Sequence, residues 1–313
     1  MLAAFASSQS PENPLSGLEI AERDDPRPRD GWEVVELRAA TLNHHDLWSL
    51  RGVGLPEDRL PMVLGCDVAG VTADGREVVV HAVIEDERGW SLFSERHQGT
   101  LSERVLVPSA NLLDKPAELS FAEAACLPTA YLTAYRMLFT RGRLRPGQRV
   151  LVQGAGGGVA TASILLAAAA GLEVTVTSRD EARLAQAREL GAHVAIASGE
   201  RVPNRVDVVI ETVGEATWKH SMRSLVEHGR IVVSGSTSGP NPGADLQRLF
   251  FRELEVIGST MGTRDELEDL LRFLALTGVR PLIESERPLA EARGAFERLA
   301  AGEAFGKLVL TAG

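Results

Sequence analysis

Cysteine is scarce in this sequence, which has only Cys66 and Cys126 among its 313 residues. So few cysteines exclude a secreted scaffold held by disulfides. One disulfide stays open, but two free thiols in the cytoplasm are the simpler interpretation. No basic stretch followed by an apolar run stands at the amino terminus, so we expect no secretory signal. These absences together predict a cytoplasmic protein.

Long hydrophobic runs and an excess of positive charge are missing as well. The longest apolar stretch, Val159–Ala170, is rich in alanine and has about half of the ~20 residues that cross a bilayer, so it predicts a buried helix and no membrane partner. Lys and Arg number 33 against 43 Asp and Glu, a net charge of −10, which argues against a nucleic-acid-binding surface. A ligand that carries phosphate would therefore need a local cationic pocket.

The composition that is present, 44% hydrophobic and 24% charged residues, is typical of a soluble globular protein, and the length suits two domains. Up to about residue 125, short β-type runs alternate with Pro, Gly and Asp turns. The clearest of these runs are Glu33–Leu37, Val78–Val83 and Leu101–Val107. This pattern predicts an irregular β domain.

From Val150 onward, short strands alternate with helices, which predicts an α/β fold with a doubly wound parallel sheet. The expected strands are Val150–Gln153, Glu173–Thr177, Val206–Ile210, Arg230–Ser234 and Glu255–Gly258, and the first two expected helices are Gly157–Ala170 and Asp180–Leu190. The tail after Met261 predicts two helices and a strand, at Asp265–Leu276, Leu289–Ala301 and Gly306–Leu310. Because the last strand has no helix with which to continue a parallel sheet, we expect it to return to the amino-terminal domain.

A glycine-rich turn follows the first of the parallel strands and opens an Ala/Leu helix, the context that a dinucleotide-binding turn requires. Glycines let the backbone approach a pyrophosphate, and the helix N-terminus offers N–H groups and a partial positive charge. A strict G-x-G-x-x-G does not fit, and a flexible turn without a ligand is the alternative. We predict that the phosphates are held by Ala155, Gly156, Gly157, Gly158 and Val159.

The end of the second strand distinguishes NAD from NADP. NAD sites usually place a carboxylate there, whereas NADP sites place cations for the 2′-phosphate. Here the strand runs into Ser178 and Arg179, with Arg183 one helical turn later, and the acidic Asp180 and Glu181 are typical of the start of a helix. Ser178, Arg179 and Arg183 therefore predict NADP(H), with solvated helix residues as the alternative.

With these elements in place, the chain resembles the medium-chain dehydrogenase/reductase superfamily along nearly its whole length, close to the quinone-oxidoreductase branch. The segments that carry the resemblance are Leu42–Leu47, Leu64–Val71, Ala124–Pro128, Thr133–Tyr135, Gly154–Ala160, Arg183–Ala192, Ile210–Gly214, Gly229–Val232 and Phe305–Leu310. The turn differs from the Ala-x-x-Gly-Gly-Val-Gly of that branch at Gly154 and Ala160. The resemblance implies a GroES-like catalytic domain at 1–128, completed by 262–313, and a Rossmann dinucleotide-binding domain at 129–261.

The zinc-type members of this superfamily bind the catalytic metal through Cys, His and Cys. These positions correspond to Asn43, Cys66 and Thr129 here, and a catalytic zinc needs three protein ligands. The four cysteines of a structural zinc site are also missing between Val83 and Leu101. We therefore expect no metal. A site of another kind, built on Cys66 with Asp67, His44, His45 or His81, is the alternative.

The resemblance implies hydride transfer from NADPH to an electrophilic small molecule, a quinone or an α,β-unsaturated carbonyl compound. Asn43 and Thr129 would hold the developing oxyanion. Tyr131, His44, His45 or water would supply the proton, and Asp46 would orient Asn43 or a histidine, unless it serves the start of a helix. A zinc-dependent alcohol dehydrogenase and an NADPH-binding protein without turnover are the alternative functions.

The resemblance also implies further contacts with the cofactor and an oligomeric state. The expected contacts with the ribose and nicotinamide are Thr133, Val213, Gly214, Gly235, Ser236 and Met261. Lys307 would reach a phosphate, with a solvated lysine as the alternative. The implied assembly is a homodimer formed by the sheet edges of the nucleotide domain.

Overall fold

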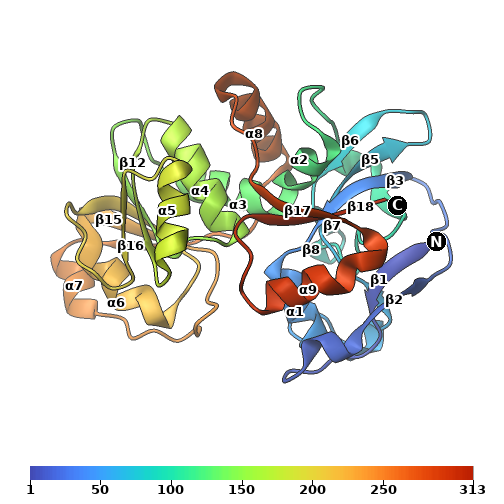
Figure 1. Ribbon diagram of the computed structural model, residues 1–313, viewed down its shortest axis with the longest axis horizontal. Coiled ribbons are helices and arrows are strands. Elements are labelled where there is room, and N and C mark those ends of the chain that lie inside the picture. Colours follow the sequence, from blue (N-terminus) through green and yellow to red (C-terminus); the bar gives the residue numbers. More distant parts are fainter. Residues whose placement is uncertain (313) are drawn as a thin grey trace. The chain divides into compact units, whose positions relative to one another are not determined.

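The computed structural model describes residues 1–312, which form two compact units (Figure 1). The β unit comprises Met1–Ala130, Thr263–Ala275 and the chain from Arg280 onward, and the α/β unit comprises Tyr131–Gly262 and Leu276–Val279. The sequence places boundaries after residues 128 and 261, and these two units divide after Ala130 and Gly262. Among the described residues, no helix has both the length and the hydrophobicity that crossing a bilayer requires.

The β unit is built mainly from short antiparallel strands. One sheet has the order β2-β1-β4, a second follows β10-β6-β5-β3-β18-β17 with β9 paired to β3, and β7 and β8 form a hairpin. The strands are β1 (Leu2–Ala6), β2 (Leu18–Glu22), β3 (Trp32–Thr41), β4 (Met62–Val63), β5 (Asp67–Thr72), β6 (Glu77–Val80), β7 (Val83–Asp86), β8 (Gly89–Leu92), β9 (Arg104–Pro108), β10 (Leu112–Asp114), β17 (Ile283–Pro288) and β18 (Lys307–Thr311). The helices are α1 (His44–Leu50), α2 (Phe121–Ala125), α8 (Arg264–Thr277) and α9 (Ala292–Ala300), with short 3-10 turns between elements.

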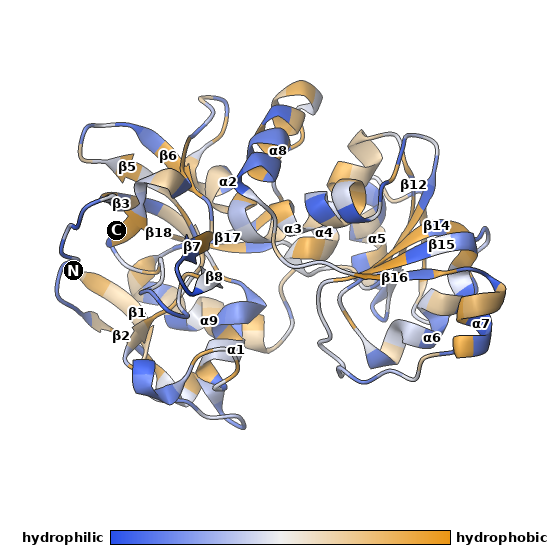
Figure 2. Cartoon of the chain, turned by 180° about the vertical axis from the view of Figure 1, so that it is seen from behind, coloured by the Kyte–Doolittle hydropathy of each residue, from blue (hydrophilic) through white to orange (hydrophobic). Residues whose placement is uncertain are grey.

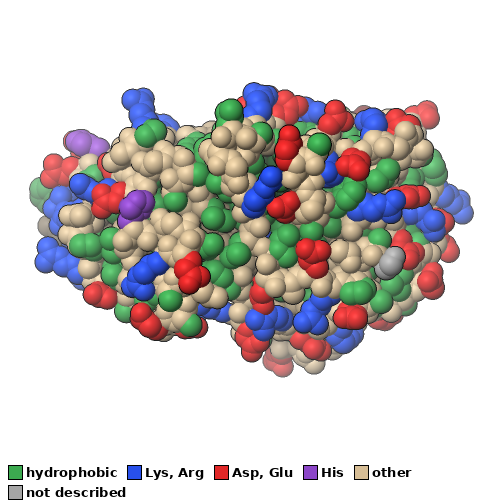
Figure 3. Space-filling view, turned by 45° about the horizontal axis from the view of Figure 1, so that its top comes forward, with side chains coloured by type: hydrophobic (Ala, Val, Ile, Leu, Met, Phe, Trp, Pro, Cys, Tyr) green, Lys and Arg blue, Asp and Glu red, His purple; other side chains and the backbone are tan. Residues whose placement is uncertain are grey.

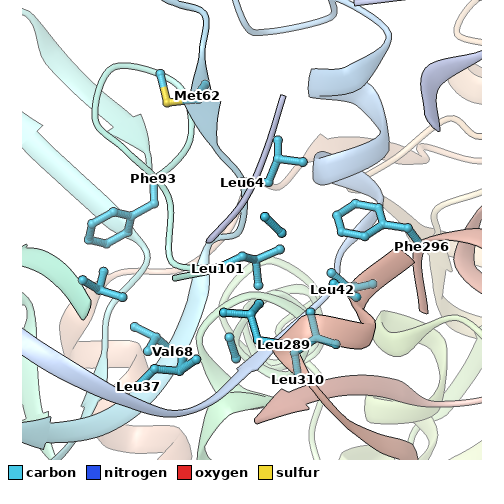
Figure 4. Close-up of a cluster of buried hydrophobic side chains, with 14 of the residues drawn as sticks. Leu37, Leu42, Met62, Leu64, Val68, Phe93, Leu101, Leu289, Phe296 and Leu310 are labelled. Atoms are coloured by element: carbon cyan, nitrogen blue, oxygen red, sulfur yellow. The ribbon is translucent and has the colours of Figure 1, made fainter. Parts of the chain in front are cut away.

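The carboxyl-terminal tail completes the β unit, as expected for the last strand. Strand β18 pairs antiparallel with β3, so that Leu310 lies opposite Ala40. Figure 4 shows Leu289, Phe296 and Leu310 of the tail in one apolar cluster with residues of the amino-terminal strands. Each such leucine contributes about 1.5–3 kcal/mol on full burial. The tail is therefore part of the core of this unit.

The α/β unit confirms the predicted doubly wound parallel sheet. Its strand order is β13-β12-β11-β14-β15-β16, and every neighbouring pair is parallel. The elements are β11 (Arg149–Val152), α4 (Gly158–Ala169), β12 (Glu173–Ser178), α5 (Glu181–Glu189), β13 (Val194–Ala197), β14 (Val206–Glu211), α6 (Glu215–Ser224), β15 (Leu225–Val233), α7 (Leu246–Phe251) and β16 (Glu255–Gly258). In Figure 1, α4 and α5 lie together and α6 and α7 lie together, and Figure 2 shows the apolar colour of β14 and β15. The strand order reverses between β11 and β14, where doubly wound sheets bind ligands.

Two predicted strands of the β unit are shorter in the structure. The run Val78–Val83 ends as a strand at Val80, and its last residue, Val83, begins the separate strand β7. The run Leu101–Val107 becomes β9 only at Arg104, because the N–H of Leu101 donates to Leu64 O. Strand β13 in the parallel sheet and strand β17 in the tail were not predicted, and neither were the π-helical segments η4 (Leu127–Tyr131) and η5 (Arg136–Arg141) around α3 (Leu132–Tyr135).

Candidate functional site

The glycine-rich turn between β11 and α4 has the geometry of an anion-binding corner. Gly154 and Gly156 have φ angles of +81° and +126°, which L side chains rarely adopt. Gly157 is the N-cap of α4, no side chain caps this helix end, and a Cβ at Gly157 would meet nothing within 4 Å. The first N–H groups of a helix have no acceptor within it. The turn therefore presents bare backbone donors at an open position.

A buried polar network beneath the turn connects the carboxyl ends of three strands. The Gln153 amide accepts from Thr177 Oγ1 at 2.7 Å and donates to Ser221 Oγ at 2.9 Å. Ser221 Oγ in turn donates to Glu211 Oε2 at 2.6 Å. Because buried polar groups with satisfied hydrogen bonds hold one geometry, this network fixes the relative positions of the turn and the loop after β14. Its members were not predicted, although Glu211 carries a clear signal as a carboxylate at a strand end before a glycine.

The loops after β14 and β15 hold several of the predicted cofactor contacts. The N–H groups of Val213 and Gly214 donate to Glu211 Oε1 at 2.8 and 3.1 Å. Gly214 has a φ of +94°, and a Cβ there would lie 2.4 Å from Gly239 O. A Cβ at Gly235 would lie 3.1 Å from a backbone oxygen of the first loop, and Ser236 follows on the exposed surface. These residues follow neighbouring strands of one parallel sheet, so they share its carboxyl edge.

Two further predicted contacts of the nicotinamide side meet within the α/β unit. Met261, which follows β16, has a φ of +42° and is buried, and its Sδ lies 4.0 Å from Thr133 Oγ1 on α3. Tyr131, in η4, is fully buried. It belongs to the α/β unit, whereas Asn43 and Thr129 belong to the β unit.

The end of β12 brings the predicted NADP residues together. Ser178 Oγ accepts from the N–H of Asp180 at 3.1 Å, and Asp180 Oδ1 caps α5 through the N–H of Ala182 at 2.8 Å. The other Asp180 oxygen lies 3.8 Å from Arg183 Nε. Arg179 is exposed, and no carboxylate of the described chain lies within ion-pair distance of it. The nearest acidic side chain in sequence thus serves the helix cap, while a guanidinium faces solvent.

In the β unit, Asp46 holds the segment that carries Asn43. Its two carboxylate oxygens accept from the N–H of Asn43 and the N–H of Gly65, both at 2.8 Å. Burial raises the pKa of Asp46, and these hydrogen bonds and nearby His45 oppose that rise. Both carboxylate oxygens are engaged with the backbone, so Asp46 has the geometry of a positioning residue at the start of α1.

The side chain of Asn43 lies between a carboxylate and an ammonium group. Its Nδ2 donates to Asp67 Oδ2 at 2.7 Å, and its Oδ1 accepts from Lys307 Nζ at 2.7 Å. Since an ammonium only donates and a carboxylate only accepts, these neighbours fix which end of the amide is which. The amide nitrogen Nδ2 has two N–H groups, and the bond to Asp67 uses only one of them. Asn43 therefore presents an oriented donor with a cation bound to its carbonyl.

Lys307 does not have the position expected for a phosphate ligand. It begins β18, and only 2% of the residue is accessible. Its Nζ donates to Leu42 O at 2.9 Å and to Asn43 Oδ1, and it lies 3.4 Å from Asp67 Oδ2. The predicted phosphate contact is wrong, because protein acceptors within the β unit surround the ammonium. The sequence could not indicate that Lys307 pairs with Asp67, because the two residues lie 240 positions apart.

Asp67 and Thr129, two residues of the β unit, each have a buried side-chain oxygen that has no partner in the part of the chain that the structure describes. One is Asp67 Oδ1, although Asp67 Oδ2 accepts from Thr41 Oγ1 at 2.5 Å as well as from Asn43. The other is Thr129 Oγ1. A buried polar atom without a hydrogen bond is costly and is often explained by a functional role. The Thr129 hydroxyl thus has an unused capacity to form a hydrogen bond.

The residues at the zinc positions do not fit a zinc ion. Asn43 offers an amide whose oxygen already binds an ammonium, and that fixed positive charge opposes a divalent cation. Cys66 donates its thiol proton to Phe93 O at 3.4 Å, and burial together with Asp46 and Asp67 raises its pKa well above the ordinary range. No group of three or more His, Cys, Asp or Glu suited to a metal occurs in residues 1–312.

The three histidines named as candidate ligands, His44, His45 and His81, differ in their neighbours. Burial and the charges of Lys307 and Arg51 lower the pKa of His44, so its neutral form is favoured at neutral pH. His45 Nε2 lies 3.2 Å from Ser94 Oγ, whose residue is fully buried with a φ of +62°. His81 is buried beside β6.

Comparisons with known proteins agree on one enzyme superfamily. The family model described as zinc-binding dehydrogenase matches residues 158–276, which include none of the three zinc positions. The acryloyl-coenzyme A reductase of Metallosphaera sedula is 29% identical over 94% of this chain and 96% of its own length, and the quinone oxidoreductase of Mus musculus is 29% identical over 91% and 90%. A solved structure of an NAD-dependent alcohol dehydrogenase is 32% identical, covers all of both chains and has a TM-score of 0.90.

Proposed function

Because the chain belongs to the medium-chain dehydrogenase/reductase superfamily, a family of oxidoreductases, we propose that it reduces a quinone or an α,β-unsaturated carbonyl compound with NADPH and without a metal. The observation that carries this proposal is the Lys307 ammonium bound to Asn43 at a position where zinc-type relatives place a metal ligand. A fixed organic cation and oriented hydrogen-bond donors then take the electrostatic role of a Lewis acid.

The α/β unit has the groups that NADPH would need. The bare N–H groups at the start of α4 would bind the pyrophosphate, and the glycines leave room for its approach. Arg179, together with Arg183, would bind the 2′-phosphate, because guanidinium forks match phosphate oxygens. Val213, Gly214, Gly235, Ser236, Thr133 and Met261 would line the ribose and nicotinamide. When bound, the cofactor supplies a hydride from C4 of its ring.

The β unit supplies the groups for the substrate oxygen. The unused N–H of Asn43 and the hydroxyl of Thr129 would donate to the oxygen as it gains negative charge. Lys307 withdraws electron density from the Asn43 amide through its carbonyl and so makes the N–H a stronger donor. For the proton, the candidates are Tyr131, His44, His45 and water, and the lowered pKa of His44 makes protonated His44 a less favoured donor.

The experiment is a substrate panel followed by the absorbance of NADPH. Quinones, enones and aldehydes are offered to the purified protein with NADPH or NADH, before and after dialysis against a chelator. We expect oxidation of NADPH by a quinone or enone, unaffected by the chelator. One tightly held zinc per chain with activity only on alcohols and aldehydes would instead indicate an alcohol dehydrogenase. Saturable NADPH binding without turnover would indicate a binding protein.

We also propose a homodimer formed through β16, an edge strand of the parallel sheet. The N–H of Ser259 donates to Val233 O, so by strand alternation Val256 presents its backbone groups outward. Phe250 and Phe251 on the neighbouring α7 are 64% and 70% exposed. An open edge beside exposed apolar side chains suits a second copy about a two-fold axis. Light scattering of Phe250→Glu should show a monomer, and a parent protein that is itself monomeric would refute the dimer.

A further inference from the structure

A cationic cavity in the β unit is separate from every group described above. It has a volume of about 420 Å³ and is lined by Arg23, Arg27, Arg29, Arg96, His97 and Arg104. The first three arginines lie on the connection from β2 to β3, which runs beside the amino terminus in Figures 1 and 2. The other two come from the segment before β9 and from β9 itself. Segments distant in sequence thus bring five guanidinium groups to one cavity.

The positive charge of this cavity is only partly neutralised by the protein. Arg104 pairs with Asp25 at 2.7 Å, and Arg96 lies 3.2 Å from Asp86. Within the described chain, Arg23, Arg27 and Arg29 have no carboxylate at ion-pair distance. Asp24 is the one acidic side chain among the lining residues. A net excess of cations therefore faces the cavity.

This local excess contrasts with the rest of the protein. The chain has a net charge of −10, and on the face shown in Figure 3 acidic and basic side chains are interspersed. Arg29 stacks on the Trp32 ring at 3.6 Å, which holds its guanidinium over the aromatic face. Like charges held together repel each other, so such a cluster is stabilised by an anion that binds it.

Unsatisfied donors lie within the same cluster. Arg96 Nε and Arg104 Nε are buried and have no hydrogen-bond partner among the described residues. Burial and the charges of Arg29 and Arg96 lower the pKa of His97, consistent with a positive potential in the cavity. Guanidinium groups bind phosphate oxygens through paired hydrogen bonds. The cavity volume also exceeds what one small inorganic anion fills and lies in the range of small-molecule sites.

We propose that this cavity binds a small molecule that carries a diphosphate group. A diphosphate offers enough anionic oxygens for several guanidinium groups at once, whereas a single carboxylate satisfies one fork. The same chemistry occurs in a free nucleoside diphosphate and in coenzyme A or its thioesters. This site is distinct from the glycine turn after β11, because all of its lining residues belong to the β unit. It does not depend on the proposed reductase activity.

The test is calorimetric titration of the full chain with inorganic pyrophosphate at low ionic strength, without NADPH, because the diphosphate of NADPH could itself enter the cavity. We expect one saturable site whose affinity falls as salt is added, because the contacts are ionic. Arg27→Gln with Arg29→Gln should weaken pyrophosphate binding by about tenfold or more, as expected for lost charged hydrogen bonds. Arg38→Gln, an exposed arginine of the same unit outside the cavity, is the matched control and should bind like the parent.

Competition then identifies the source of the diphosphate. Displacement of pyrophosphate by ADP supports a nucleotide site, and displacement by coenzyme A supports a coenzyme A site. Displacement by neither would overturn the proposal, since a site for this class must accept the ester as well as the free anion. Two further results would overturn it. One is equal affinity for pyrophosphate and citrate, and the other is loss of binding in Arg179→Gln with Arg183→Gln but not in the cavity variant.

Discussion

Replacing Lys307 by methionine would remove the cation that lies 3.4 Å from the buried Asp67 carboxylate. Asp67 is inaccessible, and its Oδ1 already has no partner within residues 1–312. Removing one member of a buried ion pair leaves an uncompensated charge and costs about 3–5 kcal/mol. Methionine keeps most of the apolar stem, so little of this loss comes from a cavity. We expect the free energy of unfolding of Lys307→Met to fall by about 3–5 kcal/mol.

The control is the double variant in which Asp67→Asn accompanies Lys307→Met. Removing both charges should restore much of the stability, with a coupling energy of about 2 kcal/mol or more in the double-mutant cycle. Urea unfolding followed by fluorescence measures this in the relevant unit, because Trp32, Trp48 and Trp90 lie in the β unit. A loss below about 1 kcal/mol with an unchanged denaturant slope, or additive single effects, would refute the buried-pair reasoning.

Three more predictions concern the proposed sites. Arg179→Gln with Arg183→Gln should weaken NADPH by about 1–3 kcal/mol more than NADH in calorimetry, and an unchanged preference would contradict the NADP assignment. Asn43→Ala should lower kcat by about 10²–10³-fold with little change in NADPH affinity, whereas a fully active variant would remove Asn43 from the mechanism. Because burial raises the pKa of Asp46 from 3.8, the folded state binds this proton more tightly than the unfolded chain, and stability falls as the pH rises from 3.8 through the raised pKa. Asp46→Asn should flatten that part of the urea-midpoint profile, and an unchanged slope would exclude Asp46 as its source.

The α/β unit could be predicted because the sequence patterns that mark its strands, turn and helices are local. The strand after Arg149 is a short apolar run, the glycines follow at once, and Gly171 and Gly191 end the first two helices. Each of these features is read within a few residues. The β unit is different, because β1 is largely alanine and β18 finds its partner β3 more than two hundred residues away. Such pairings depend on tertiary contacts, which residue patterns do not contain.

In the candidate site too, the residues that depend on local patterns could be predicted, and those that depend on long-range contacts could not. The turn, Ser178 and Arg179 were predicted from sequence, and their positions follow from the strands that precede them. The family resemblance implied that Lys307 binds a phosphate, but in the structure its neighbours are Asn43 and Asp67 from the other end of the chain. Four of the five arginines of the cavity lie in connections between strands and the fifth, Arg104, begins β9, and only folding brings them together.

The position of Lys307 on the last strand has a consequence for synthesis. While the ribosome works through the middle of the chain, β3 and β5 have already emerged, yet Asp67 waits for its counter-ion until β18 is made. The Asn43 amide likewise lacks the hydrogen bond from Lys307 until the last strand is present. The proposed reductase activity would therefore require the last strand, and a protease that removes this strand would abolish that activity without cutting the parallel sheet.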